Sequence, residues 1–194
     1  MSFFKMLFAF APWVSFLIIA RDSLFRLKLG LVVALVLVVV MGITRLHRGV
    51  ILWAGLFFFT YATVAVVLFN NMWIAQHMGV MANGALAVST WLTIAIRKPF
   101  TLDYAREHTD PSLWDHPLFI RTNFVIASVW GLAFSVSAIL AWGKIEHFIL
   151  SELGYEVITY TLLIGTLAFS TWYPNYVRRT RELEERVLAT QQIE

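Results

Sequence analysis

The chain alternates between long apolar runs and shorter polar segments, and this alternation predicts helices that cross a membrane. The hydrocarbon core of a bilayer, about 30 Å thick, needs about 20 predominantly apolar residues in an α-helix. Six windows of the chain are long and apolar enough to consider as spans. We therefore predict an all-α integral membrane protein with about six transmembrane helices arranged as three hairpins. The spans are expected at residues 3–20, 29–43, 50–69, 72–96, 122–142 and 154–173.

Composition supports a single membrane domain. The chain of 194 residues is 59% hydrophobic and 14% charged, whereas a soluble domain carries roughly 45–50% apolar and about 25% charged residues. The six windows use most of residues 1–194, which leaves no separate soluble domain. The chain has no cysteine, which excludes disulfides, thiolate catalysis, iron–sulfur clusters and cysteine zinc sites. The net charge of +3 is attributed to basic residues in cytoplasmic loops, and no nucleic-acid partner is expected.

The first two windows allow more than one interpretation. The run at residues 3–20 begins like a signal peptide but lacks a small-x-small cleavage site, so we interpret it as an uncleaved span. The window at 29–43 has only 15 residues, which is short for the hydrocarbon core. Its helix could extend back to Leu24, with Arg26 and Lys28 snorkelling to the interface. Alternatively, one of the two windows dips into the membrane without crossing it. We favour six complete spans.

The distribution of basic residues predicts the orientation. With six spans, the polar segments fall alternately on two sides of the membrane. One side holds eleven of the 15 Lys and Arg residues, including those after each of the fourth and sixth windows, and the other side holds four. Because basic loops face the cytoplasm, we expect both termini there.

Two segments of the chain end alike. "STWLTIAIRKPF" begins at Ser89 and "STWYPNYVRRTR" begins at Ser170. In both, Trp suits the membrane interface and the following cations suit lipid headgroups. Each is preceded by a Trp-Gly-bearing helix and followed by a polar, helix-prone segment. This predicts a parallel internal repeat of a helix hairpin plus a cytoplasmic surface segment. The alternative is convergence, because any inward helix end favours this composition.

The polar segment at residues 97–121 is expected on the cytoplasmic side. Pro99 ends the preceding span, and Thr101 can cap a short helix that follows. Asp110 and Pro111 mark a second helix start. The apolar residues of these short helices predict amphipathic segments lying along the inner interface.

The C-terminal segment at residues 175–194 is expected to be a cytoplasmic helix. Opposite charges recur four residues apart, as in Arg178 with Glu182 and Arg181 with Glu185. Each such pair contributes about 0.2–0.5 kcal/mol, which favours a solvated helix. Its thin apolar stripe could instead meet a partner helix or the membrane surface.

A stretch of the chain resembles a known family. "RKPFTLDYARE", then Trp, then "HPLF", then "ASVWGLAF", over residues 97–134, is similar to small bacterial membrane proteins related to intracellular septation protein A. The resemblance implies a bacterial inner-membrane protein linked to envelope growth or division, with no established enzymatic activity. It also implies a scaffold or interaction role through the cytoplasmic face. The candidate interaction residues on this face are Lys98, Pro99, Tyr104, Arg106, Glu107 and Trp114, and the resemblance extends to Pro117, Trp130 and Gly131.

Polar side chains inside the windows indicate a second possible function. Such residues cost free energy in a bilayer unless they are buried and paired, so each is a functional candidate. Gln76, His77 and Asn83 lie in the fourth window, and Glu156 begins the sixth. They could line the path of a transporter or channel for a small solute or lipid. They could equally cap helix ends or bond a neighbouring helix.

Other chemistry finds little support in the sequence. The residues Glu107, His108, Asp110, Asp115 and His116 offer ligands for a divalent metal, but their spacing matches no known motif. His77 and His147 lack the placement of a haem pair. We therefore expect no catalytic residues, no metal and no cofactor. The expected partners are the lipid bilayer, a membrane or cytoplasmic protein, or a second copy of the chain.

Overall fold

The computed structural model describes residues 10–20, 23–44, 49–107, 109–147 and 150–191, with side chains described as far as Arg181. Every regular element within these ranges is helical. The first half of the chain forms α2 (Ala11–Ile19), α3 (Leu24–Ile43), α4 (Val50–Thr63), the π-helical turn η1 (Val64–Leu68), α5 (Met72–Gln76) and α6 (Met78–Ala95). The second half forms α7 (Thr101–Arg106), the 3₁₀ turn η2 (Pro111–Leu113), α8 (Pro117–Ile145) and α9 (Glu152–Gln191).

The described helices confirm an all-α protein compatible with several membrane crossings. Five stretches are long and apolar enough to cross: α3, α4 together with η1, α6, α8, and residues Glu152–Arg181 of α9. The described part of the first predicted window, α2, has nine residues, and residues 3–9 of that window lie outside the described ranges. A sixth span and the division into three hairpins therefore stay predictions.

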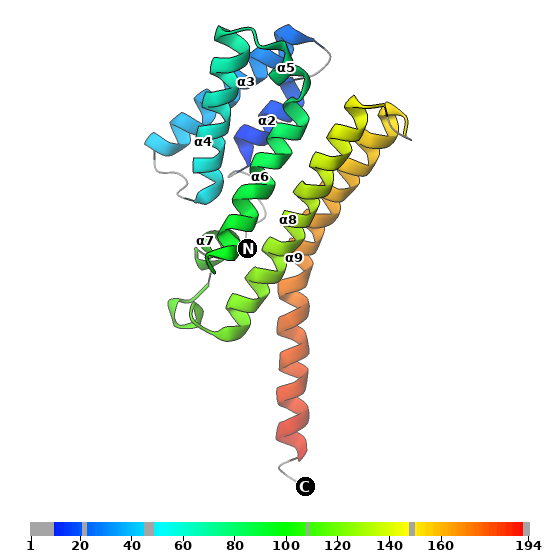
Figure 1. The fold of residues 1–194 in the computed structure, drawn as a ribbon. Coiled ribbons are helices and arrows are strands. Elements are labelled where there is room, and N and C mark those ends of the chain that lie inside the picture. Colours follow the sequence, from blue (N-terminus) through cyan, green and yellow to red (C-terminus); the bar gives the residue numbers. More distant parts are fainter. Residues whose placement is uncertain (1–9, 21–22, 45–48, 108, 148–149, 192–194) are drawn as a thin grey trace.

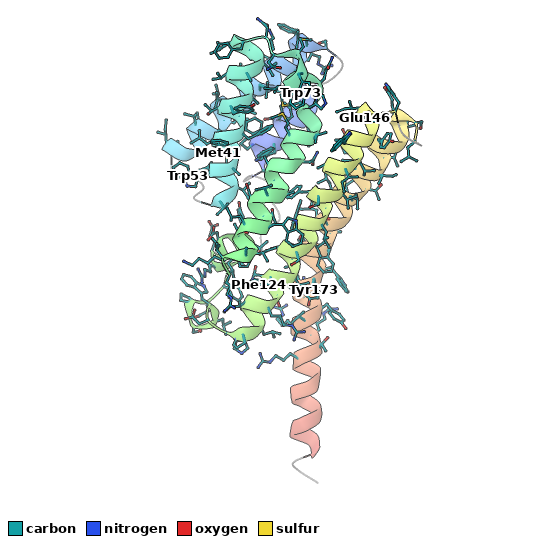
Figure 2. All side chains as sticks on the ribbon, viewed as in Figure 1. Met41, Trp53, Trp73, Phe124, Glu146 and Tyr173 are labelled. Atoms are coloured by element: carbon teal, nitrogen blue, oxygen red, sulfur yellow. The ribbon has the colours of Figure 1, made fainter. Side chains whose placement is uncertain are left out.

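The helices form a chain of neighbours in which each packs on the next. In Figure 1, α2, α3 and α4 cluster on one side, α6 runs through the middle, and α8 and α9 form an antiparallel pair on the other side. The most extensive helix–helix contact joins α6 to α8. We name the two ends of the molecule after the short helices there. Trp73 and Glu146 mark the α5 end, while Phe124 and Tyr173 lie toward the α7 end (Figure 2).

The second window is a full-length helix that starts earlier than residue 29. Helix α3 begins at Leu24 and has 20 residues, enough at 1.5 Å per residue to cross the hydrocarbon core. Ser23 caps it by accepting a hydrogen bond from the Arg26 backbone N–H at 3.2 Å. The Lys28 ammonium donates to the side-chain oxygen of Asn70, just before α5. This is the extension that the snorkelling alternative predicted.

Three other helices have bounds that differ from the predicted windows, whose limits as membrane spans stay predictions. The window at 72–96 is interrupted at His77, whose φ of −92° and ψ of 12° separate α5 from α6. Helix α8 starts at Pro117, five residues before the predicted span, because His116 caps it through a bond from Leu118 N–H. Helix α9 runs unbroken through Pro174, so the last span and the C-terminal helix are one element. The ion pairs predicted with Glu182 and Glu185 lie outside the described side chains.

Aromatic side chains fill the core where α2, α4 and α8 approach one another. Phe10 stacks on Trp130 with ring centroids 5.4 Å apart and planes 13° apart. Trp13 stacks on Phe58 at 5.2 Å. These rings are buried, with at most 8% of each residue exposed. Short α2 is therefore anchored to the long helices through its aromatic face.

Two tryptophan–serine hydrogen bonds join neighbouring helices. Trp91 Nε1 of α6 donates to Ser135 Oγ of α8 at 3.1 Å, and Trp130 Nε1 of α8 donates to Ser170 Oγ of α9 at 2.9 Å. Gly131 leaves room for the Trp91 ring, because a Cβ there would lie 2.9 Å from Trp91 Cε2. The two Ser-Thr-Trp stretches therefore contribute different residues to these bonds: the first contributes its Trp as a donor, and the second contributes its Ser as an acceptor. The internal repeat stays a prediction.

Candidate functional site

Two of the four residues predicted to line a polar path meet in one cavity at the α5 end. Gln76 at the end of α5 and Glu156 near the start of α9 both line a cavity of about 570 Å³. Three further polar residues line it, namely Ser23, Lys144 of α8 and Tyr160 of α9. Lys144 Nζ lies 3.0 Å from Glu156 Oε1, and the two side chains are 37% and 50% exposed. Such an exposed pair contributes little to stability, at most about 1 kcal/mol, so both charges are available to a ligand.

His77 lies at the same end but does not line this cavity. Its Nδ1 is 2.8 Å from the backbone oxygen of Trp73, and its ring stacks on the Trp73 ring at a centroid distance of 4.2 Å. It occupies the junction between α5 and α6. These contacts assign His77 a local role in turning the chain.

Asn83 lines a second, smaller cavity deeper in the molecule. This cavity of about 180 Å³ is surrounded by aromatic and aliphatic side chains of α2, α6, α8 and α9. Asn83 Nδ2 donates to the Gly79 backbone oxygen of its own helix at 2.9 Å. Its amide is therefore already bonded within α6, and the cavity as a whole is apolar.

The two cavities share Phe16 and Leu17 of α2 on their walls. Helix α2 forms one side of this common space, and Leu163 and Ile164 of α9 lie on the opposite side of its apolar part. We call the whole the lateral groove. The lateral groove is polar at the α5 end and apolar toward the middle of the spans. An amphiphile has the same order of a polar and an apolar part along its length.

At the other end of the molecule, the candidate interaction segment is partly buried. Pro99 and Tyr104 are buried, and the apolar side chains of α7 pack on the protein rather than along a lipid interface. The Phe100 backbone N–H donates to Thr93 Oγ1 at 3.2 Å. Thr101 does not cap α7, because its hydroxyl donates to the Asn123 backbone oxygen of α8 at 2.9 Å. The segment at residues 97–121, which we call the cap of the α7 end, is therefore held in place by contacts with α6 and α8.

Of the remaining candidate interaction residues, two are exposed and two, Arg106 and Trp114, are half-buried. Lys98 and Glu107 are exposed. The Arg106 guanidinium lies 5.4 Å from the centre of the Trp114 ring, a cation–π distance. Trp114 is itself held by a bond from its Nε1 to the Thr109 backbone oxygen at 3.0 Å. A partner at this end would therefore meet Lys98, Glu107 and the Arg106–Trp114 pair.

Burial perturbs two ionisable groups of the cap. Burial raises the pKa of the Asp103 carboxyl above its ordinary value, against the opposing effect of the Arg106 guanidinium. Burial also raises the pKa of the Tyr104 phenol, and the charges of Asp103 and Glu107 add to the shift. Tyr104 is thus a neutral packing residue at physiological pH.

Two of the residues considered for a metal have other contacts. Asp110 accepts a hydrogen bond from Ser112 N–H at 2.9 Å, and His116 accepts one from Leu118 N–H at 3.2 Å. His108 lies outside the described residues. Within the described ranges, no three His, Asp or Glu side chains gather as metal ligands would.

Comparison of the chain with protein-family models, with curated proteins and with solved structures returned no match. The geometry of the lateral groove and of the cap therefore carries the functional argument. Sequence reasoning missed Lys144 and Tyr160. A signal for Lys144 existed, since a cation ends one helix and Glu156 begins the next across a short connection.

Proposed function

We propose that this protein is a non-enzymatic membrane protein that binds an amphiphile, a lipid or a lipid-like molecule, in the lateral groove. The observation that carries the proposal is the shared wall formed by Phe16 and Leu17. Through it, a polar cavity at the α5 end adjoins an apolar cavity among the helices. The polar cavity would hold the headgroup of the amphiphile, and the apolar cavity would hold the first part of its hydrocarbon chain.

The polar cavity has the size and charges of a headgroup site. Its volume of about 570 Å³ lies within the range of about 300–1,000 Å³ that is usual for small-molecule sites. The Lys144 ammonium and the Glu156 carboxylate present one charge of each sign. Gln76 and Tyr160 add an amide and a phenol as hydrogen-bonding groups. This set suits a headgroup that bears both a donor and an anionic oxygen.

The apolar cavity suits hydrocarbon. Its volume of about 180 Å³ compares with apolar cavities of about 150 Å³ that stay dry and bind a ligand such as benzene. Its edges lie at the outer surface of the helices, because Leu17 is 45% exposed and Ile164 is 67% exposed, and in a membrane this surface would meet lipid. An amphiphile can therefore enter sideways from the membrane.

The same features disfavour a path for ions or polar solutes. Beyond the polar cavity, Asn83 is the only polar residue among those described around the apolar one, and its amide is bonded to Gly79. His77 lies off the groove. A hydrated solute would lose its water there without replacement contacts. The scaffold role implied by the septation protein A resemblance stays a separate prediction for the α7 end.

Photolabelling tests the proposal. The protein is reconstituted in nanodiscs containing a phospholipid with a photoreactive group on the first part of its acyl chain, and labelled peptides are mapped by mass spectrometry. Label is expected on α2 and α9 around the apolar cavity. Leu167→Trp, which fills that cavity, should lower this labelling several-fold. Leu92→Trp, on an exposed position of α6 outside both cavities, should leave it unchanged. Equal labelling in the two variants refutes groove binding.

A further inference from the structure

The polar end of the lateral groove holds a cation and an anion side by side. Lys144 Nζ of α8 lies 3.0 Å from Glu156 Oε1 of α9, and both side chains line the cavity of about 570 Å³. We propose that this pair selects a zwitterionic phospholipid with a primary amine, of the phosphatidylethanolamine type, from the amphiphiles that enter the groove. This selection rests on the proposed amphiphile binding in the lateral groove and adds the chemical class of the headgroup.

The two charges are arranged to receive an ammonium and a phosphate next to each other. A carboxylate offers about four acceptor positions and an ammonium offers three donors, so one contact at 3.0 Å uses a small part of either group. In an ethanolamine headgroup, a short ethylene linker joins the ammonium to the phosphate. The ammonium therefore reaches the Glu156 carboxylate while the phosphate reaches the Lys144 ammonium, and each contact is a charge-assisted hydrogen bond.

The close packing of α8 and α9 holds the backbones that carry these charges. Gly143 precedes Lys144, and Tyr155 precedes Glu156. Both Gly143 and Tyr155 are buried, and a Cβ at Gly143 would lie 3.1 Å from Tyr155 Oη. The Tyr155 ring thus lies directly against the backbone of α8, beside both charged residues. Helices held in this way keep the two charges within reach of one headgroup.

The described wall of the polar cavity suits a primary amine better than a choline. A primary ammonium donates hydrogen bonds, whereas a quaternary ammonium donates none and is bound by several aromatic faces. Gln76 and Glu156 provide an amide oxygen and a carboxylate as acceptors. Phe16 and Tyr160 are the aromatic residues among the described lining, and the Phe16 ring packs on Phe59 at a centroid distance of 5.7 Å. The described wall therefore offers acceptors rather than an aromatic cage.

Exposed tryptophans at the α5 end place the polar cavity at the level of lipid headgroups. Trp73 is 62% exposed and Trp142 is 59% exposed, and Figure 2 shows Trp73 and Glu146 at this end. Tryptophans are enriched at the interface between hydrocarbon and headgroups. The shared wall of Phe16 and Leu17 leads from there to the apolar cavity. This continuity favours a lipid over a soluble amine.

Photolabelling with matched headgroups tests the selection. The protein is reconstituted in phosphatidylcholine nanodiscs with a trace of one probe lipid, which carries a photoreactive group on the first part of its acyl chain. The probe bears an ethanolamine, a choline or a glycerol headgroup on the same chains, and label on α2 and α9 is measured by mass spectrometry. The ethanolamine probe is expected to label the lateral groove about fivefold more than either other probe, the ratio that corresponds to about 1 kcal/mol for one exposed ion pair.

Two variants separate the roles of the charges. Glu156→Gln removes the carboxylate that receives the ammonium, so ethanolamine labelling should fall to the choline level while choline labelling persists. Lys144→Gln removes the partner of the phosphate, which both probes carry, so choline labelling should fall about fivefold and the preference for ethanolamine should persist. Glu146→Gln is the control and should keep the wild-type preference. Glu146 is exposed at the same end, lines neither cavity and loses the same charge in the variant.

The outcomes distinguish the headgroup selection from amphiphile binding itself. Equal labelling of the wild-type groove by the ethanolamine probe and either other probe overturns the selection and leaves amphiphile binding in place. The selection is also overturned if the preference survives in Glu156→Gln or is lost in Glu146→Gln. Absence of label from the groove with all three probes refutes the proposed function, and the selection with it.

A further arm separates the lipid from a soluble ligand of the same chemistry. Soluble phosphoethanolamine is added to the nanodiscs that contain the ethanolamine probe. It lacks the hydrocarbon chain that the apolar cavity would hold, so labelling of the groove should stay unchanged. If phosphoethanolamine displaces the probe, the ligand is a soluble phosphorylated amine and the lipid assignment is wrong.

Discussion

Replacing Ser170 by Ala tests how α9 is held against α8, and so how the wall of the lateral groove is fixed. Ser170 is 0% exposed and accepts the hydrogen bond of Trp130, which is 5% exposed. The Ser170 hydroxyl also donates to the Thr166 backbone oxygen of its own helix at 2.8 Å. In Ser170→Ala, the indole N–H of Trp130 is left buried without this acceptor.

The expected cost follows from burial. A buried donor left unsatisfied costs about 1–3 kcal/mol, whereas side-chain hydrogen bonds between membrane helices average about 0.6 kcal/mol and reach about 1.7. The Trp130–Ser170 bond lies inside the helix pair, where neither water nor lipid replaces the serine. We therefore expect Ser170→Ala to lower the free energy of unfolding by about 1–2 kcal/mol.

A double-mutant cycle of Trp130→Phe and Ser170→Ala measures the bond itself. Reversible unfolding in mixed detergent micelles gives the four free energies. The matched control cycle uses Trp91→Phe and Ser135→Ala, because Trp91 is 39% exposed and its bond is accessible. The coupling energy should be about 1 kcal/mol or more in the buried pair and smaller in the exposed pair. Equal couplings, or none in the buried pair, refute the reasoning from burial.

Two more predictions concern the α6–α8 contact and the cap. Gly131→Ala should destabilise the protein by about 1–3 kcal/mol in the same unfolding assay, since the new Cβ would lie 2.9 Å from the Trp91 ring; an unchanged free energy would mean that the ring moves aside freely. Burial raises the pKa of Asp103 above 3.8, so the stability linked to this group is full below pH 3.8 and is lost as pH rises through the raised value. Asp103→Asn should remove that loss, and identical pH profiles of unfolding for variant and wild type would contradict it.

Hydropathy alone predicted the existence and approximate positions of the long helices, because an apolar run of membrane length has few alternatives. Boundaries depended on local contacts. The start of α3 was found among the alternatives considered, since Ser23 is a capping residue and Arg26 and Lys28 have long stems. The early start of α8 was missed because its cap is a histidine, which is not among the preferred capping residues.

The break at His77 and the continuity through Pro174 went against local expectation. Nothing in "MWIAQHMG" predicts the interruption, since no proline is present and Gly79 alone is tolerated in membrane helices. Pro174 lacks an N–H and usually ends a helix in water. In α9 it lies at the end of the apolar run, where the chain continues as helix with α8 alongside. Neighbouring α8 residues accompany the continuity at Pro174, whereas the contacts given for His77 are local ones to Trp73.

The lateral groove could be predicted only in part. Gln76 and Glu156 were identified as polar residues in apolar windows, and the fold brings them to one cavity. His77 was identified by the same rule but turns to Trp73, because periodicity does not fix the direction of a side chain at a helix break. The facing of α2 and α9, about 150 residues apart, is set by packing over the whole chain, so no local pattern encodes the groove.

The shallow burial of α9 determines how firmly the lateral groove is closed. Only 17% of its most apolar window is buried, against 28–44% in the other four candidate spans, and its main neighbour is α8. The distance between α9 and α2 is thus set through α8, chiefly at Trp130 and Ser170. An amphiphile in the lateral groove would contact both α2 and α9 and so add to the few contacts that hold α9. We therefore expect it to stabilise the packing of α9 against the other helices. By linkage, a variant that loosens this packing binds the amphiphile less well. Ser170→Ala should therefore lower photolabelling of the lateral groove, and unchanged labelling would contradict this coupling.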